Sequence, residues 1–241
     1  MISLFHNASQ VVTVNSGGKD FKTVSDMSQL NIHEDASIVV EDTRIVDLII
    51  GSKIPKKIDR KIDLTGKVVM PGLIDCHTHT AYAGSRANEF REKLAGVGYE
   101  DIAKRGGGIN TTVGAVRNSS HDDLLKLVQA RIDYFIEQGV TTLEIKSGYG
   151  LSFYDEIKLL QVINQLNTQN KIDIIPTFLG AHMFPQEYTN DHGKYLDIII
   201  EEMLPYIAKN KLAKFVDAFC EETAFQIDEI DKIFSASSNS C

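Results

Sequence analysis

The chain has 241 residues, of which 43% are hydrophobic and 24% are charged. This composition is ordinary for a globular protein with a sizeable core, and the length suits one large domain or a small and a medium one. The net charge of −8 argues against a nucleic-acid partner, which would need a basic face. No apolar run reaches the ~18 residues of a membrane span.

The chain's start and its cysteines indicate the compartment. The first six residues carry no basic leader, so no signal peptide is expected. Cys76, Cys220 and Cys241 lie far apart and do not resemble a disulfide framework, which indicates a reducing compartment. We therefore expect a cytoplasmic protein with no membrane or nucleic-acid partner, in which Cys76 is a buried core thiol.

Residues 1–66 predict a small all-β element. Residues 37–41 and 44–50 are rich in β-branched side chains and read as the two arms of a hairpin, with Asp42 and Thr43 at its turn. The polar stretch 17–34 reads as a loop.

From residue 67 the pattern changes to strands that alternate with helices. Strand-like apolar runs cover residues 68–75, 140–146, 172–178 and 215–220. Such alternation predicts a parallel sheet with right-handed crossovers, and continuously apolar strands are typical of burial on both faces. We predict a TIM-like (β/α) barrel, with an open doubly wound sheet as the alternative. A closed barrel needs eight βα units, and only about four are visible, so about half a barrel is present.

Three helices are expected between these strands. One begins at Ser120, an N-cap residue, and ends before Gly139. The second runs over residues 154–166, and the third spans 188–210 with a bend at Pro205. The serine-rich residues 232–241 predict a disordered or divergent tail. The predicted domains are therefore 1–66, 67–231 and this tail.

His77 and His79 stand directly after the apolar run that ends at Asp75. Residues two apart on a strand point to the same face, so the two imidazoles can converge on one point. A divalent metal with nitrogen ligands needs such convergence. Histidines that only cap the strand are the alternative interpretation.

Several separated motifs then carry a family resemblance. They occur in order at residues 71–79, 83–86, 106–109, 144–151, 178–182 and 215–221. Together they resemble the imidazolonepropionase family of the amidohydrolase superfamily, over roughly residues 35–230. The resemblance implies a metal-bearing α/β fold, a TIM-like (β/α)8 barrel with a small β-sandwich. Residues 1–66 would be the N-terminal part of that sandwich and 67–231 the first half of the barrel.

The resemblance also implies an activity and a site. The activity is hydrolysis of the ring amide C–N bond of 4-imidazolone-5-propanoate, a small-molecule substrate, to N-formimidoyl-L-glutamate in histidine degradation. His77 and His79 would bind one divalent metal, zinc or iron. Arg86, Tyr149 and His182 would bind substrate, with Tyr99 a lesser candidate. The family's third histidine and its acid/base aspartate belong to later strands and have no counterpart in residues 1–241, so no catalytic acid/base is assigned.

Three alternatives stay open. The chain could be the hydrolase, a truncated non-catalytic form of it, or another cyclic amidohydrolase. Lys146 reads as a structural residue, or as one that supports a metal ligand from behind, rather than as a metal-bridging one, because the resemblance implies a single metal. Half a barrel would expose two sheet edges and an apolar face, which predicts poor solubility or assembly with another chain, a homodimer being the candidate.

Overall fold

The computed structural model describes residues 1–51, 57–98, 101, 106–221 and 223–239. The chain divides into two compact units, Met1–Gly72 and Leu73–Cys241, rather than after residue 66 as the sequence predicts. The run 68–75 is not one strand. Its first part pairs within the first unit and its second part within the other, because Pro71 has no N–H to donate to a ladder and interrupts the run.

The first unit is a single five-stranded sheet. Its strands are β1 (Ile2–Val12), β2 (Ile32–Glu41), β3 (Arg44–Ile50), β4 (Arg60–Asp63) and β5 (Val68–Val69). The order is β3-β2-β1-β4, with β5 also on β1. The predicted hairpin is present as β2 and β3, and Asp42 takes a left-handed φ of 53° at its turn. A second sheet that would make this unit a sandwich is not found among its described residues.

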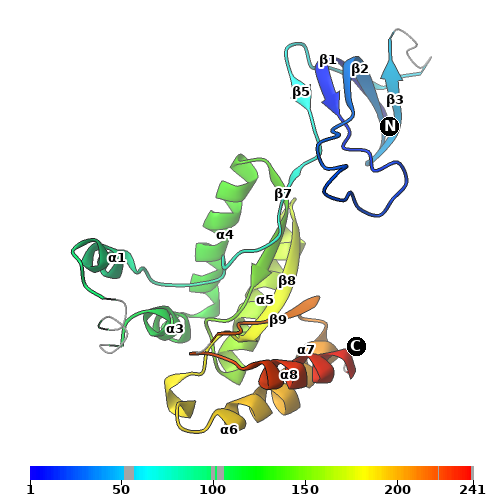
Figure 1. Cartoon of the computed structure of the whole chain (residues 1–241). Helices are drawn as coiled ribbons and strands as arrows, with labels where there is room; N and C mark the ends of the chain where they lie inside the picture. The colour runs from blue at the N-terminus through cyan, green and yellow to red at the C-terminus, as the bar shows by residue number, and fades with distance from the viewer. Residues whose placement is uncertain (52–56, 99–100, 102–105, 222, 240–241) are drawn as a thin grey trace. The chain divides into compact units, whose positions relative to one another are not determined.

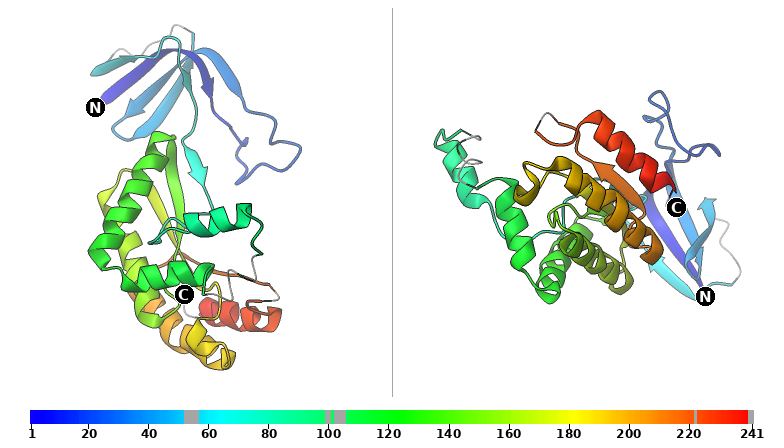
Figure 2. Two further views of the ribbon diagram at one scale, coloured as in Figure 1. Left: turned by 90° about the vertical axis from the view of Figure 1, so that its left-hand side faces the viewer. Right: turned by 90° about the horizontal axis from the view of Figure 1, so that it is seen from below.

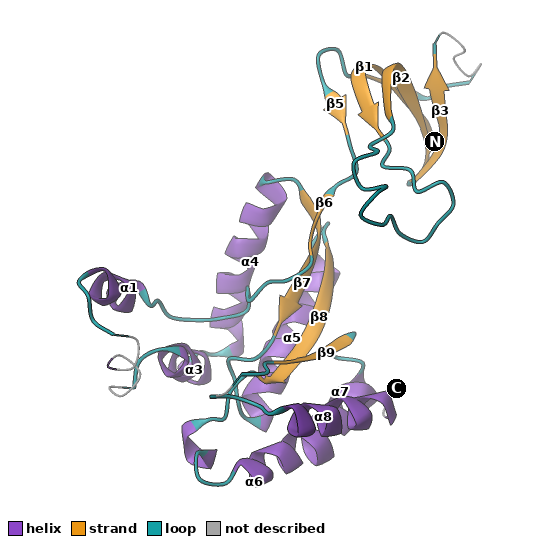
Figure 3. Ribbon diagram, viewed as in Figure 1, coloured by secondary structure: helices purple, strands orange, loops and turns teal. Residues whose placement is uncertain are grey.

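The second unit contains a four-stranded parallel sheet in the order β6-β7-β8-β9. The strands are β6 (Leu73–Asp75), β7 (Val140–Lys146), β8 (Asp173–Ala181) and β9 (Phe215–Ala218). The sheet is curled and its strands alternate with helices, so this unit is α/β (Figure 3). The predicted strand over 140–146 is confirmed at both ends.

Helices pack against one face of this sheet (Figures 1 and 2). The described helices are α1 (Ala87–Leu94), α3 (Ile109–Asn118), α4 (His121–Glu137), α5 (Phe153–Gln169), α6 (His192–Asp197), α7 (Leu204–Asn210) and α8 (Ile227–Asn239). Short η1 (Gln186–Tyr188) precedes α6, and the π-helical η2 (Ile198–Met203) joins α6 to α7. None of the helices in the described ranges is long and apolar enough to cross a bilayer.

Two of the three predicted helices are confirmed. Ser120 caps α4 by accepting a hydrogen bond from the Asp123 N–H, and α5 covers the second predicted range. The third predicted helix, 188–210, ends at Asn210 as expected but starts at His192. Its middle, Ile198–Met203, is π-helical, and this π-helical turn stands directly before the turn that contains Pro205.

The disordered tail predicted from residue 232 is wrong for residues 232–239, which belong to α8. Although the segment is rich in serine, its apolar residues recur at helical spacing, at Ile227, Ile230, Ile233 and Phe234. Ile233 is fully buried in the main core. Packing of this stripe therefore outweighs the polar composition.

The main core lies between the sheet and the helices, and the described residues of this unit leave the opposite face of the sheet open. Leu143, Ile145 and Ile174 lie in that core with the apolar stripes of α4 and α5. On the open face, a cavity of about 280 Å³ is lined by residues of all four strands. Phe215 on edge strand β9 is 54% exposed. An uncovered sheet face, which the sequence predicts for half a barrel, is thus present.

Candidate functional site

The loop after β6 carries His77 and His79, and a carboxylate of β7 holds it. The buried Glu144 accepts the Thr78 N–H through Oε2 at 2.9 Å, and its own carbonyl accepts the Thr78 hydroxyl. The Lys146 N–H donates in turn to the Thr78 carbonyl at 3.1 Å. The residue between the two histidines is therefore fixed to β7 by both its backbone and its side chain.

The same carboxylate takes part in a buried charge network. The Lys146 Nζ lies 2.7 Å from Glu144 Oε1 and 2.9 Å from Asp217 Oδ2 on β9. Burial lowers the pKa of Lys146, but hydrogen bonds to the two carboxylates outweigh burial and the net shift is upward. The ammonium thus stays charged and ties β7 to β9.

The loop after β7, residues 147–151, carries Tyr149 between two glycines. A β-carbon on Gly148 would lie 2.9 Å from the Leu179 carbonyl oxygen, and one on Gly150 would lie 2.5 Å from backbone atoms of Asp155 and Glu156. Only glycine permits these approaches. The loop is therefore pressed against β8 on one side and against the start of α5 on the other.

His182 follows β8 and faces this loop. Its Nδ1 lies 2.8 Å from the Gly148 carbonyl oxygen. Because a carbonyl can only accept, Nδ1 must carry the proton. Burial lowers the pKa of His182, so the ring is neutral at pH 7 and its Nε2 presents a lone pair.

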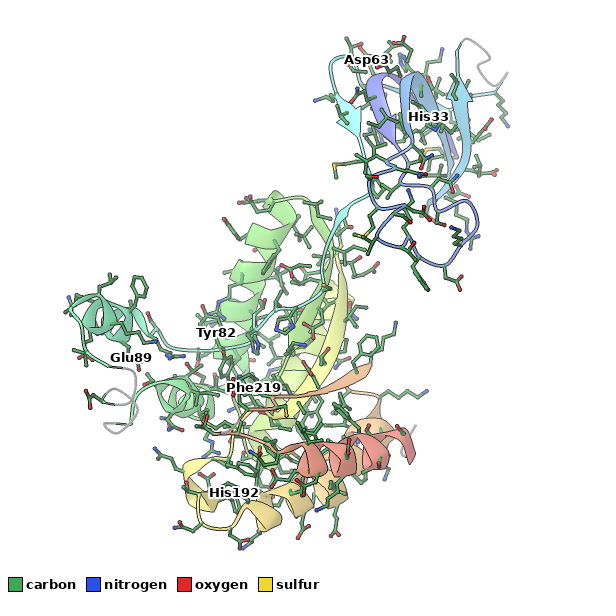
Figure 4. All side chains as sticks on the ribbon, in the orientation of Figure 1. His33, Asp63, Tyr82, Glu89, His192 and Phe219 are labelled. Atoms are coloured by element: carbon green, nitrogen blue, oxygen red, sulfur yellow. The ribbon has the colours of Figure 1, made fainter. Side chains whose placement is uncertain are left out.

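The rings of these loops form one cluster. The His79 ring centroid lies 5.6 Å from that of His77, 5.8 Å from that of Tyr149 and 5.1 Å from that of His182, on which it stacks. Tyr82 and Phe219 border the cluster (Figure 4), with centroids 6.3 Å from Tyr149 and 6.1 Å from His182. Burial raises the pKa of Tyr149, so its phenol remains a hydrogen-bond donor.

A cavity of about 420 Å³ opens beside this cluster. Its lining consists of His79, Tyr82, Gly84, Ser85, Arg86, Thr112 and Tyr149. Arg86 Nε is bound to Glu89 Oε2 at 2.9 Å, and its Nη1 and Nη2 make no hydrogen bond among the described residues. The structure thus brings His79, Arg86 and Tyr149 to one cavity, while His77 and His182 do not line it but contact the His79 ring.

Glu89 lies on α1 (Figure 4) and binds Arg86, which lines this cavity. Its carboxylate accepts from Arg86, from the Thr111 hydroxyl and from the Gly108 N–H that precedes α3. Burial raises the pKa of Glu89, but these hydrogen bonds outweigh burial and the net shift is downward. The carboxylate therefore stays ionised and joins α1, Arg86 and α3.

The donor set at the β6 loop fits part of a metal shell. His79 Nδ1 is buried and has no hydrogen-bond partner among the described residues. Burial, with His182 and His77 nearby, lowers the pKa of His79 to about 4, so the ring is neutral and able to donate a lone pair. Two imidazoles are half of a four-coordinate shell. Within the described part of the chain, no group of three or more His, Cys, Asp or Glu is placed to hold a metal.

The prediction for Cys76 is wrong, and the one for Tyr99 falls on a residue that the structure does not describe. Cys76 is exposed and lines the open face of the sheet, not the core, because the described residues of the second unit do not cover that face. Tyr99 lies outside the described residues. The roles of His77, His79, Arg86, Tyr149 and His182 remain predictions, although the structure places the five residues in one neighbourhood.

Sequence reasoning missed the groups that hold the two loops. Glu156 and Arg117 contact the loop after β7, and Asp217 contacts Lys146. One signal was available, since Glu156 stands on the apolar stripe of its own helix, four residues before Leu160. A carboxylate on a stripe that faces the core is a buried charge with a local task.

No family model matches the chain, but curated relatives do. An imidazolonepropionase from Clostridium tetani is 43% identical over 95% of this chain and 55% of its own length. One from Brucella abortus is 45% identical over 87% of this chain and 52% of its own length.

Solved structures show a similar fold at low identity. A zinc complex of atrazine chlorohydrolase TrzN from Arthrobacter aurescens matches 98% of this chain and 51% of that chain, with a TM-score of 0.61 and 14% identity. Guanine deaminase from C. acetobutylicum matches 100% of this chain and 51% of that chain, with a TM-score of 0.57 and 19% identity. The chain spans about half the length of the curated relatives it matches, and by its sequence it belongs to the imidazolonepropionase family.

Proposed function

We propose that this chain carries the substrate pocket and two metal ligands of an imidazolonepropionase. The reaction would be hydrolysis of the ring amide of 4-imidazolone-5-propanoate to N-formimidoyl-L-glutamate. One observation supports this most strongly: in a chain 43% identical to a curated imidazolonepropionase, Arg86, Tyr149 and His79 line one cavity. An arginine and a polar aromatic rim suit a small ring that bears a carboxylate.

Each residue would have a distinct task in binding. The free guanidinium edge of Arg86 would pair with the propanoate carboxylate, for which its planar fork is suited. The Tyr149 phenol would donate a hydrogen bond to the ring. His182, with its proton on Nδ1, would accept a ring N–H at Nε2. These contacts orient the substrate and so contribute proximity rather than bond making.

The metal belongs to this proposal. His77 and His79 would hold one divalent ion, zinc or iron, with further ligands that the described residues do not assemble. When bound, such an ion supplies an activated water at neutral pH and polarises a carbonyl. Buried imidazoles held neutral, as His79 is, suit this task.

The architecture is proposed on the same footing. The unit Leu73–Cys241 would be the first half of a (β/α)8 barrel and Met1–Gly72 the N-terminal part of a β-sandwich. The open face of the four-stranded sheet and the doubled length of the relatives support this. A cytoplasmic location and a homodimer remain predictions.

A non-catalytic chain is the second candidate, because no group of three or more potential metal ligands is assembled in the described residues. The purified chain should be assayed for loss of 4-imidazolone-5-propanoate with added Zn²⁺ or Fe²⁺. Turnover that Arg86→Gln weakens establishes the hydrolase. Binding of a substrate analogue without turnover establishes the non-catalytic form. Absence of both contradicts the proposed function.

A further inference from the structure

Two helices of the second unit make a matched pair with one difference. Helices α4 and α5 each have 17 residues and a serine N-cap that accepts a hydrogen bond from an aspartate N–H three residues later. The next position is Leu124 in α4 and Glu156 in α5, and both side chains have no exposed surface. An apolar residue is the favourable choice there, because burying a carboxylate is costly unless hydrogen bonds compensate.

The compensation for Glu156 comes from the loop that carries Tyr149. Glu156 Oε1 accepts the N–H groups of Gly150 at 2.7 Å and Leu151 at 2.9 Å, and Oε2 accepts that of Gly148 at 2.9 Å. Burial raises the pKa of Glu156, and these hydrogen bonds, with one from Ser147, oppose the shift. One buried carboxylate thus binds three backbone N–H groups within four residues of chain.

Arg117 of α3 holds the same loop through its carbonyls. Its Nε donates to the Gly150 carbonyl and its Nη2 to the Leu151 carbonyl, each at 2.8 Å. Its Nη2 also lies 2.8 Å from Glu187 Oε1, which orients the guanidinium. Side chains from two helices, Glu156 and Arg117, therefore bind backbone donors and acceptors of residues 148–151, in addition to the backbone hydrogen bond from Ser147 to Thr177 of β8.

The loop in turn fixes the two residues that face the ring cluster. Tyr149 lies between Gly148 and Gly150, both of which Glu156 binds. The Gly148 carbonyl accepts the His182 Nδ1–H and thereby sets which nitrogen of His182 carries its lone pair. A displacement of Gly148 would change the direction of the phenol and the tautomer of the imidazole together.

We propose that Glu156 and Arg117 are positioning residues that clamp residues 147–151 and so preset Tyr149 and His182 for a ligand. The ligand class is an imidazole-type ring that bears a carboxylate, and this part rests on the proposed function. The clamp itself rests only on the hydrogen bonds above.

The first test measures hydrogen exchange at single backbone amides of the full chain. Glu156→Leu reproduces the α4 arrangement, and Glu156→Gln keeps one acceptor oxygen of the same shape. Exchange at Gly148, Gly150 and Leu151 should be about tenfold or more faster in Glu156→Leu, and intermediate in Glu156→Gln, with the interior amides of α5 unchanged. Equal protection in Glu156→Leu and the wild-type chain would overturn the clamp.

Leu124→Ala is the matched control. It removes buried contacts at the corresponding position of α4 and so lowers stability without touching the loop. It should leave the three amides protected relative to the rest of the unit. Loss of their protection in this control would show a general effect of stability and would also overturn the clamp.

The second test measures the dissociation constant of 3-(imidazol-4-yl)propanoate. We expect about tenfold weaker binding in Glu156→Leu and in Arg117→Gln, a smaller loss in Glu156→Gln, and no loss in Leu124→Ala. Unchanged affinity despite a loosened loop would overturn the link to Tyr149 and His182. If the wild-type chain itself does not bind the ligand, the proposed function and this link fail, and the exchange result alone decides on the clamp.

Discussion

The loops after β6 and β7 are neighbours on one parallel sheet, yet they are held in different ways. Each is tied to a buried carboxylate, Glu144 for the first and Glu156 for the second. Glu144 divides its oxygens between one backbone N–H and Lys146. Glu156 gives both oxygens to backbone N–H groups of its loop.

The two loops differ in whether their polar groups have hydrogen-bond partners. The loop after β7 has its donors and acceptors bound by Glu156 and Arg117, and all of these groups are in the chain. The loop after β6 is fixed at Thr78, but the imidazole of His79 has a buried nitrogen for which the described part of the chain offers no partner. The proposed substrate pocket is therefore preset within these residues, whereas the proposed metal shell requires more ligands than the described residues supply.

The largest effect is expected when the anchor of the first loop is removed. Glu144→Ala would leave Lys146 buried with only Asp217 and leave the Thr78 N–H without an acceptor. We expect the free energy of unfolding to fall by about 3–5 kcal/mol. Urea unfolding followed by circular dichroism measures this, and a loss below about 1 kcal/mol would show that the network does not hold the loop.

The loop after β7 should be destabilised by a steric clash rather than by the loss of a charge. In Gly150→Ala the new methyl would lie 2.5 Å from backbone atoms at the start of α5. We expect a loss of about 1–3 kcal/mol of unfolding free energy. Gly114→Ala in α3 is the control, because no heavy atom lies within 4 Å of its β-carbon and an alanine there should stabilise the helix by about 0.5–1 kcal/mol. Equal effects of the two substitutions would contradict the close packing.

The pH dependence should distinguish the first loop. The folded chain lowers the pKa of His79 from 6.5 to about 4, so the unfolded chain binds more protons in that window. The free energy of unfolding should therefore fall as the pH falls from 6.5 to about 4. In His79→Gln the unfolding free energy should fall less steeply with decreasing pH. The difference in slope should correspond to a fraction of one proton taken up on unfolding. Coincident pH profiles for the two proteins would mean that His79 is not held neutral by the fold.

The smallest effect on stability is expected at the mouth of the cavity. The Arg86 side chain is 37% exposed, so solvent screens its pair with the less exposed Glu89, and Glu89 keeps its hydrogen bonds to Thr111 and Gly108 without Arg86. Arg86→Gln should therefore cost less than about 1 kcal/mol. Its affinity for 3-(imidazol-4-yl)propanoate should nevertheless fall about tenfold. Arg86→Lys tests whether the planar fork is needed. A large loss of stability with unchanged affinity would assign Arg86 to structure instead.

The sequence predicts the parts of this molecule that depend on local pattern. The hairpin at Asp42, the cap at Ser120 and the strand over 140–146 all follow from residue type and spacing. The pair His77 and His79 and the residues around the cavity follow from motifs in order. These features need only a few neighbouring residues to be recognised.

The parts that depend on distant contacts were not predictable. The run 68–75 divides between two sheets because its first part pairs with β1 and its second part with β7. Cys76 is exposed because the described residues of the second unit do not cover its face of the sheet. The serine-rich end forms a helix because Ile233 packs into the main core of the second unit. Arg117 and Glu156 contact the same loop from two helices, and no spacing in the sequence reveals that meeting.

One measurement tests the central claim, that substrate recognition is preset in this chain without a metal. It is calorimetric titration of 3-(imidazol-4-yl)propanoate into the chain after treatment with a chelator. We predict saturable binding at one site per chain, weakened in both Arg86→Gln and Glu156→Leu. No binding by the metal-free chain, or binding that neither substitution weakens, would contradict the account.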